Sequence, residues 1–371
     1  MIVMKKFKLL VLVGAASVVA AAPSVASARP FLDRFSNVSE VASTVPASGP
    51  AQGDQNPYGV AVVGRSVGDL VRGDVLVSNF NNAQNQQGTG SSIVEVSPGG
   101  RARVFAVIPQ PTATPAVGLT TALVVLRSGF VIVGSMPAPG GMSSAAGAGA
   151  LTILNSTGHV VATLSAGDIN GPWDMTAVER RNRVVLFVTN VLNGTVAAGG
   201  NVVDQGTVVR ITLTVARGSM ARVDSERVIA TGFEEHTDPN ALVVGPTGVG
   251  FGRNGVLYVA DSNGNRIAAI PNALSRTSVL SGGGRTVLSG HGLSDPLGLT
   301  VAPNGDLVTV NRGNGRALEV TPTGNRVAVR TLVRNGAGDL FGLAIAPGED
   351  GLYFVNDAST GPAANSLELL H

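Results

Sequence analysis

A phrase that returns six times along the chain is the feature that most constrains its fold. Each copy enters a short apolar stretch through a Pro-x-Gly step or a looser version of it. A tight polar turn follows, and a second apolar stretch ends on Asn, Asp or Ser. The clearest copies are 296–311 (PLGLTVAPNGDLVTVN) and 246–261 (PTGVGFGRNGVLYVAD), and the six copies begin near residues 57, 116, 172, 246, 296 and 340. This repetition predicts an all-β fold, a six-bladed β-propeller with four-stranded antiparallel blades.

The fifth copy can be laid out strand by strand. We expect its strands at 298–302, 306–310, 317–321 and 326–333. The turn between the first two strands is Pro-Asn-Gly, in which glycine supplies the positive φ that a tight hairpin needs. The first strand of each blade should line the central channel, and the fourth should lie outermost.

The sixth copy ends without a fourth strand. Its third strand, 366–370, is followed only by the last residue, whereas 36–45 near the start is a strand-like segment with no place in any copy. An unpaired outer edge would be prone to aggregation, so the missing strand must come from elsewhere in the chain. We therefore predict that 36–45 completes the sixth blade, and that 29–371 forms one propeller domain.

The N-terminal residues have the pattern of an export signal. Lys5, Lys6 and Lys8 precede an apolar run at 9–22, and small residues at 26–28 provide a cleavage site. The run is too short for a comfortable membrane span. We expect 1–28 to be a cleaved signal peptide and the mature protein to be a periplasmic or secreted monomer without membrane insertion; an uncleaved anchor is the alternative.

Composition excludes several chemistries. The three signal lysines are the only lysines in the chain, so cleavage leaves 23 basic residues, all Arg, against 24 acidic ones. This balance gives no reason to expect nucleic-acid binding, and a mature chain without lysine has no Schiff-base chemistry. Cysteine is absent, which excludes disulfides and thiolate sites. We expect no cofactor.

The loops that follow the second strand are unevenly long. They are extended in four blades, at 81–92, 136–150, 192–206 and 357–365, and short in the other two. Alternating strand direction puts them on the same face as the blade-to-blade connections, which we call the top face. Loops that elaborate a rigid scaffold commonly carry function, so we predict a ligand or partner site there. Neutral insertions are the alternative.

Two sets of residues are candidates for that site. The second strands end on polar residues, which either cap the strand ends or contact a ligand. The residues before the first-strand glycine predict an apolar floor at the channel mouth. From the two sets we select Tyr58, Asn79, Trp173, Asn190, Asp261, Asn311 and Phe341 as ligand-binding; the remaining members are Ser135, Asn356, Val117, Thr247 and Leu297.

The fourth copy, with GVLYVADSNGNRIAAIP at 255–271, resembles the NHL family of six-bladed propellers. The resemblance implies the fold and leaves function open, because the family and its relatives include binding proteins, virginiamycin B lyase-like enzymes and gluconolactonase-like enzymes. In the last of these, acidic or Asn side chains before the first-strand glycine bind a divalent cation. Here those positions hold no carboxylate or amide, so we expect no metal site.

A few residues favour catalysis instead. Asp174 occupies a position where other copies have glycine, and it follows the only tryptophan of the chain. A carboxylate at a channel mouth could act as a base, although a salt bridge to an arginine would also explain it. His236 and His291 lie in stretches between blades and could serve as a base or as solvated loop residues. We therefore prefer a non-catalytic propeller that binds a small ligand or protein partner, with a lyase or hydrolase around Asp174, His236 and His291 as the alternative.

Overall fold

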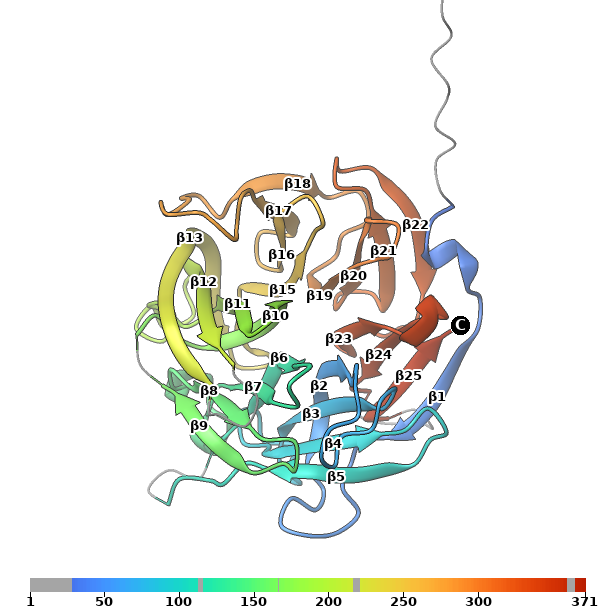
Figure 1. Ribbon diagram of the computed structural model, residues 1–371. Helices are drawn as coiled ribbons and strands as arrows, with labels where there is room; N and C mark the ends of the chain where they lie inside the picture. Colours follow the sequence, from blue (N-terminus) through green and yellow to red (C-terminus); the bar gives the residue numbers. More distant parts are fainter. Residues whose placement is uncertain (1–28, 113–115, 166, 216–220, 359–363) are drawn as a thin grey trace, which may run out of the picture.

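The computed structural model describes residues 29–371 except 113–115, 166, 216–220 and 359–363. Six antiparallel sheets stand around a central axis, as Figure 1 shows along that axis. The prediction of a six-bladed propeller from the repeated phrase is confirmed. The predicted signal peptide, 1–28, lies outside the described residues.

The six blades follow one another along the chain. The first is β2 (Gln55–Val62), β3 (Val75–Asn81), β4 (Ser92–Val96) and β5 (Ala102–Val107), and the second is β6 (Leu119–Val125), β7 (Val131–Ser135), β8 (Ala150–Leu154) and β9 (Val160–Leu164). The third is β10 (Pro172–Arg180), β11 (Arg183–Asn190), β12 (Val203–Thr214), β13 (Arg222–Asp238) and β14 (Leu242–Val244). The fourth is β15 (Pro246–Phe251), β16 (Leu257–Asp261), β17 (Arg266–Ile270) and β18 (Arg285–Ser289). The fifth is β19 (Pro296–Val301), β20 (Leu307–Asn311), β21 (Arg316–Val320) and β22 (Arg326–Thr331), close to the bounds predicted from its sequence.

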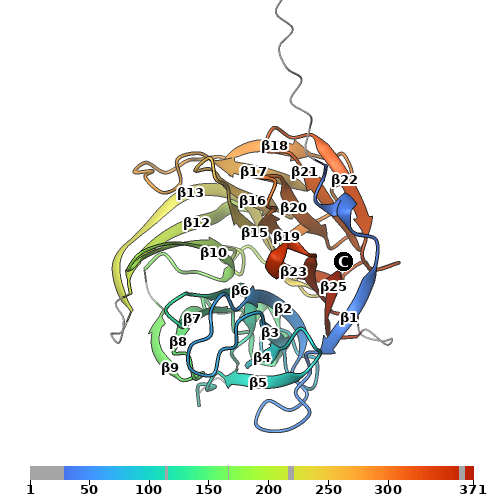
Figure 2. The same ribbon diagram turned by 45° about the vertical axis from the view of Figure 1, so that its right-hand side comes forward.

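The sixth blade is completed by the start of the chain. It consists of β23 (Leu340–Ile345), β24 (Leu352–Asn356), β25 (Ser366–Leu370) and β1 (Val38–Ser43), and β1 pairs with β25 so that Val38 faces Leu370 and Ser43 faces Ser366. In Figures 1 and 2 the blue β1 runs alongside the red sixth blade. The predicted closure of the ring by the N-terminal segment is confirmed.

A buried carboxylate fixes the segment before β1. The backbone N–H groups of Phe31 and Leu32 each donate to one side-chain oxygen of Glu319 at 2.7 Å, and all three residues are buried. Leu32 begins a short 3₁₀ turn, η1 (Leu32–Arg34). The other 3₁₀ turns are η2 (Pro139–Gly141), η3 (Ser143–Ala145) and η4 (Pro347–Glu349), and among the described residues no helix has the length and apolarity to cross a membrane.

The glycine of the repeated step lies where neighbouring inner strands meet. A Cβ added to Gly298 would lie 2.2 Å from the carbonyl oxygen of Phe341, and one added to Gly342 would lie 2.1 Å from that of Tyr58. Real Cβ atoms do not approach so closely, and glycine avoids the clash. The repeat therefore specifies the tight packing of inner strands around the channel.

The inner strand of the second blade departs from the predicted alignment. Each inner strand has a β-bulge near its start. In β6 this bulge contains one residue more than in the other five inner strands. Ser78 Oγ donates to the carbonyl oxygen of Thr120 at 2.8 Å, as Thr189 Oγ1 donates to that of Thr247. Thr120 is thus the residue before the glycine position, and the placement of Val117 there was wrong. Val117 packs instead in a hydrophobic cluster between the first two blades.

The third blade carries a fifth strand that the sequence did not lead us to expect. The stretch FEEHTD, which we read as part of a connecting loop, belongs to the 17-residue strand β13, and its last residues pair with β14. His236 faces Val244 across this pairing. The short hairpin brings 239–241 to the mouth of the channel, where it contributes to the site described next.

Candidate functional site

The central channel has a cavity at each end. The top cavity, of about 220 Å³, is lined by the beginnings of the inner strands and by loops of the top face. The lower cavity, of about 320 Å³, is lined by later residues of the same strands, such as Val62, Val125 and Ile345. Tyr58, Trp173, Leu297 and Phe341 line only the top cavity, so they form its floor.

Aromatic side chains build this floor. Tyr58 is stacked between Phe80 and Phe341, with ring centroids 4.4 and 4.0 Å away, and Trp173 packs at 5.5 Å from Tyr58. Burial raises the pKa of the Tyr58 hydroxyl, and the nearby Asp357 raises it further. The indole Nε1 of Trp173 is buried without a hydrogen-bond partner among the described residues. The predicted apolar floor therefore contains one buried donor without an acceptor among the described residues.

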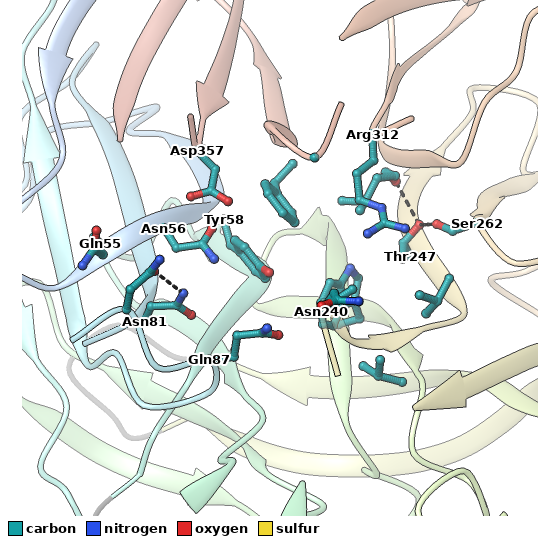
Figure 3. A pocket seen from close by; sticks show the side chains of 18 of the residues that line it. Gln55, Asn56, Tyr58, Asn81, Gln87, Asn240, Thr247, Ser262, Arg312 and Asp357 are labelled. Atoms are coloured by element: carbon teal, nitrogen blue, oxygen red, sulfur yellow. Dashed lines mark hydrogen bonds between the residues drawn. The ribbon is translucent and has the colours of Figure 1, made fainter. Parts of the chain in front are cut away.

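The walls of the top cavity are rich in amides. Three of them, Asn56, Asn85 and Asn365, have positive φ of 62°, 57° and 51°, a conformation that Asn tolerates better than most residues. The Asn365 side chain accepts the Asn56 backbone N–H at 2.7 Å, and Asn81 Nδ2 donates to Asn85 Oδ1 at 2.7 Å (Figure 3). The amide residues that line the cavity are Gln55, Asn56, Asn81, Asn85, Gln87, Asn240 and Asn365.

Asp357 places a carboxyl group among these amides. With its Nδ2 turned toward Asp357, Asn56 donates to both carboxylate oxygens, at 3.0 and 2.9 Å, and accepts from Asn81 Nδ2 at 3.1 Å. Burial raises the pKa of Asp357 well above its ordinary value, and the negative charge of Asp339 adds to this shift. The labelled side chains in Figure 3 show Asp357 and Asn56 together on one side of the cavity.

The opposite side carries Arg312 beside two hydroxyls. Arg312 donates through Nε at 2.8 Å and through Nη2 to Asp295 Oδ2, so its charge is already paired. Thr247 Oγ1 lies 2.8 Å from Ser262 Oγ, which donates to the Pro296 carbonyl oxygen at 2.6 Å. Figure 3 shows Arg312, Thr247 and Ser262 across the cavity from Asp357. The site can thus bind a ligand through hydrogen bonds from several directions above an aromatic surface.

The hairpin of β13 and β14 covers part of the mouth. Asn240 and Ala241 at its tip line the top cavity. Gln87, from the long loop of the first blade, donates to the carbonyl oxygen of Pro239 at 3.4 Å and joins the two sides of the opening. Long insertions in different blades therefore meet over the same cavity, on the face where loop lengths predicted a site.

The structure places the predicted floor residues and the polar residues at the ends of the second strands differently. Tyr58, Trp173 and Phe341 line the top cavity, whereas Asn79, Asn190, Asp261 and Asn311 do not. The polar residues at the second-strand ends are buried, and they form hydrogen bonds to neighbouring residues of the propeller. Their hydrogen bonds run from Asn79 to Thr44 and Ser92, from Asn170 to Asn190, from Arg266 and Gly264 to Asp261, from Asn311 to Gly292 and Asn314, and from Asn356 to Glu368.

Asp174 lines the lower cavity, whereas we expected its carboxylate at the channel mouth on the top face. The inner strands run down the channel from the top face, so the residue after Trp173 already lies below the floor. The carboxylate accepts the N–H of Val249 in the next blade at 2.9 Å and that of Met175 at 2.7 Å. Burial raises the pKa of Asp174 from 3.8 to about 7, although these two hydrogen bonds oppose the shift.

The structure does not bring Asp174, His236 and His291 together. His291 is exposed in the turn before β19, and its carbonyl oxygen accepts from Arg326 at 2.8 Å. His236 is half-buried in β13, next to the fully buried Glu235. Burial raises the pKa of Glu235 from 4.5 to about 8. Neither histidine lines the top or the lower cavity, and no hydrogen bond among the described residues joins any two of the three.

Sequence reasoning missed several residues of the top cavity. Asp357 was noted only as the start of a long loop, and Asn56, Gln87, Asn240 and Arg312 were not selected. The available signal was their position, since all lie in or next to top-face connections. Which of many loop residues turns inward depends on loop conformation, and the repeat does not encode that.

Among the described residues, no group of three or more His, Asp or Glu side chains is arranged to hold a metal ion. Among the described residues that line the top cavity, Asp357 supplies the one carboxylate, and Asn56 donates to both of its oxygens. Its remaining acceptors are amide, hydroxyl and carbonyl oxygens. The chemistry available in the site is therefore that of hydrogen bonding, aromatic contact and one carboxyl group.

Comparisons with known proteins add support for the fold. No protein-family model matches the sequence, and no curated protein matches it significantly. Solved structures do match over most of the chain. A calcium-binding regucalcin from Agrobacterium tumefaciens has a TM-score of 0.57 at 15% identity and covers 91% of this chain and 93% of its own.

Two further structures are similar to the same extent. The PQQ-bound aldose sugar dehydrogenase of Streptomyces coelicolor has a TM-score of 0.54 at 14% identity, covering 90% of this chain and 97% of its own. A putative gluconolactonase has a TM-score of 0.52 at 14% identity, covering 93% and 96%. At such low identity these likenesses establish the six-bladed fold, which hosts many unrelated functions.

Proposed function

We propose that this protein binds a small organic ligand in the top cavity and acts by binding rather than by catalysis. The observation that carries the proposal is the build of the cavity: an aromatic floor that includes Trp173 and walls rich in amide side chains surround about 220 Å³. Concave apolar pockets with a few inward polar groups are the usual form of ligand sites. From the N-terminal sequence we further propose that the protein is exported to the periplasm or secreted.

The catalytic alternative gains little from the arrangement of its residues. A general base must lie within hydrogen-bond reach of the proton that it removes, and a second group usually orients it. Asp174 bonds to two backbone N–H groups in the lower cavity, and His236 and His291 line neither cavity. The solved structures of similar fold include enzymes, but their identity of 14–15% carries no residue of theirs to this chain.

A thermal-shift screen tests the proposal. Sugars, sugar lactones, cell-wall fragments and small amines would be added to the protein, since a ligand at about 100 times its dissociation constant adds about 2.7 kcal/mol of stability. Ala241→Phe should fill the cavity mouth and abolish the shift. The control is Ala83→Phe, an exposed position in the long loop of the first blade.

We expect at least one compound to stabilise the wild type and the Ala83→Phe variant but not Ala241→Phe. The proposal fails if every stabilising compound acts equally on Ala241→Phe, or if none of the panel stabilises the protein.

A further inference from the structure

The carboxyl group of Asp357 lies in a cavity and has no cationic partner among the described residues. No ion pair among the described residues includes it. The neighbouring charge of Asp339 has the same sign, and the two residues are linked because the Asp357 N–H donates to the Asp339 carbonyl oxygen at 2.8 Å. A buried carboxylate without a counter-charge is costly, so it is either protonated or neutralised by something that binds.

Arg312 does not supply the missing charge. It lines the same cavity, but its Nε and Nη2 both donate to Asp295. Figure 3 shows its guanidinium on the wall opposite Asp357. The described part of the chain thus leaves the negative charge on this side of the cavity without a counter-charge.

Unsatisfied acceptors accompany this carboxyl group. Asn81, only 2% exposed, and Gln87 each keep a buried side-chain oxygen without a hydrogen-bond partner among the described residues. Both line the top cavity, where the indole N–H of Trp173 is the corresponding unpartnered donor. A buried acceptor without a donor costs free energy. These atoms are buried in the wall and floor of the cavity, so a ligand that donates to either oxygen must turn that side chain toward the cavity.

The floor suits a positive charge as well. Both faces of the Tyr58 ring are covered by Phe80 and Phe341, so the open aromatic surface of the cavity comes from Phe341 and Trp173. Aromatic rings attract cations through their electron-rich faces, most strongly when water is excluded.

We propose that the ligand of the top cavity carries a primary ammonium group, held by the Asp357 carboxylate above the rings of Phe341 and Trp173. This inference rests on the proposed function and names the class of its ligand. A primary ammonium supplies three N–H donors and a positive charge, which are what this side of the cavity lacks.

Binding should be linked to protons. The groups that face Asp357 are Asn56, Tyr58, Asp339 and, across the cavity, Arg312, and burial together with Asp339 holds its pKa high. An ammonium ion binds the ionised form, so affinity rises with pH until Asp357 is fully ionised in the free protein. It falls again when the amine loses its own proton, near the pKa of a lysine side chain, about 10.4.

Calorimetric titration of the full chain with n-butylammonium and with 1-butanol tests the proposal, because the two probes have nearly the same shape and differ in charge. We expect butylammonium to bind and 1-butanol to bind far more weakly. Asp357→Asn should weaken butylammonium binding by about thirtyfold or more, as expected when one partner of a buried charge pair is removed. The control is Asp204→Asn, an exposed carboxylate at the top-face end of β12.

Equal binding of both probes overturns the proposal, because it shows that shape rather than charge is recognised. So does butylammonium binding that survives in Asp357→Asn, or calcium chloride competing for the site, which identifies a metal ion instead. Should Asp357→Asn fail to fold, the difference between the two probes in the wild type decides the question. A third outcome separates this inference from the proposed function. If neutral compounds bind, Ala241→Phe abolishes their binding and butylammonium does not bind, the ammonium inference is wrong and the proposed function is retained.

Discussion

Glu319 shows how one residue can hold a distant segment. It is fully buried on β21, and its two carboxylate oxygens accept consecutive N–H groups from Phe31 and Leu32, almost 300 residues earlier. Asn304 also donates to it at 2.8 Å. Nothing in the repeat distinguishes this glutamate, because its partners precede the first blade. Such contacts between unrelated parts of the chain are invisible to local sequence patterns.

Replacing Glu319 by Ala should lower the free energy of unfolding by about 2–4 kcal/mol, because two buried N–H groups lose their acceptors. Urea denaturation measures the change, and Glu319→Gln should cost less since it keeps one acceptor oxygen. The exposed Glu349→Ala is the control. A loss under about 0.5 kcal/mol, as for ordinary surface substitutions, would mean that the N-terminal segment is not held by this carboxylate.

Asp174 makes stability depend on pH. Its pKa is raised from 3.8 to about 7 in the folded protein, so the folded state binds the proton more tightly than the unfolded state. Its contribution to stability is therefore fully present below about pH 4, declines as pH rises toward 7, and is constant above. Glu235, with a pKa of about 8, extends the decline to higher pH.

The variant Asp174→Asn should lose less stability than the wild type between pH 5 and pH 7, by on the order of 1–2 kcal/mol. Urea unfolding at pH 5, 6 and 7 gives the slope of the unfolding free energy against pH for each protein. The exposed Asp168→Asn is the control. Parallel slopes for Asp174→Asn and wild type would show that the carboxylate titrates at its ordinary pKa.

At the scale of elements, the repeat predicted strands well where it was regular. The fifth blade has its four strands close to the predicted bounds. The second blade was misaligned because one extra residue at the bulge of β6 moves the pattern. The length of β13 was also missed, since a strand that continues past its blade into a hairpin looks like a connecting loop in sequence.

The closing strand offers the clearest prediction at this scale. Deleting 29–46 removes β1 and the buried side chains of Phe31 and Leu32, which are 2% and 0% exposed. We expect a loss of at least about 3 kcal/mol from their burial, together with aggregation at the exposed edge of β25. Thermal unfolding and light scattering of the deletion are compared with a chain that starts at residue 29. Equal melting temperatures would contradict a closing role for β1.

For the whole molecule, the sequence predicted which face carries the candidate cavity better than which residues line it. Uneven loop lengths identified the top face, and the alignment of inner strands identified Tyr58, Trp173 and Phe341 as the floor of a cavity there. The walls come from loops whose conformations depend on contacts between blades, as in the bond from Gln87 to Pro239. The proposed binding function therefore depends on this one cavity.

The most direct test of that function is fluorescence of Trp173, the only tryptophan of the chain, during titration with a compound that stabilises the protein. Because Trp173 lies in the floor of the top cavity, binding there should change its emission saturably, with the dissociation constant found by calorimetry. The change should disappear in Ala241→Phe and persist in Ala83→Phe. A compound that binds with unchanged Trp173 emission, and binds equally well to Ala241→Phe, would place the ligand elsewhere and contradict the proposed binding function.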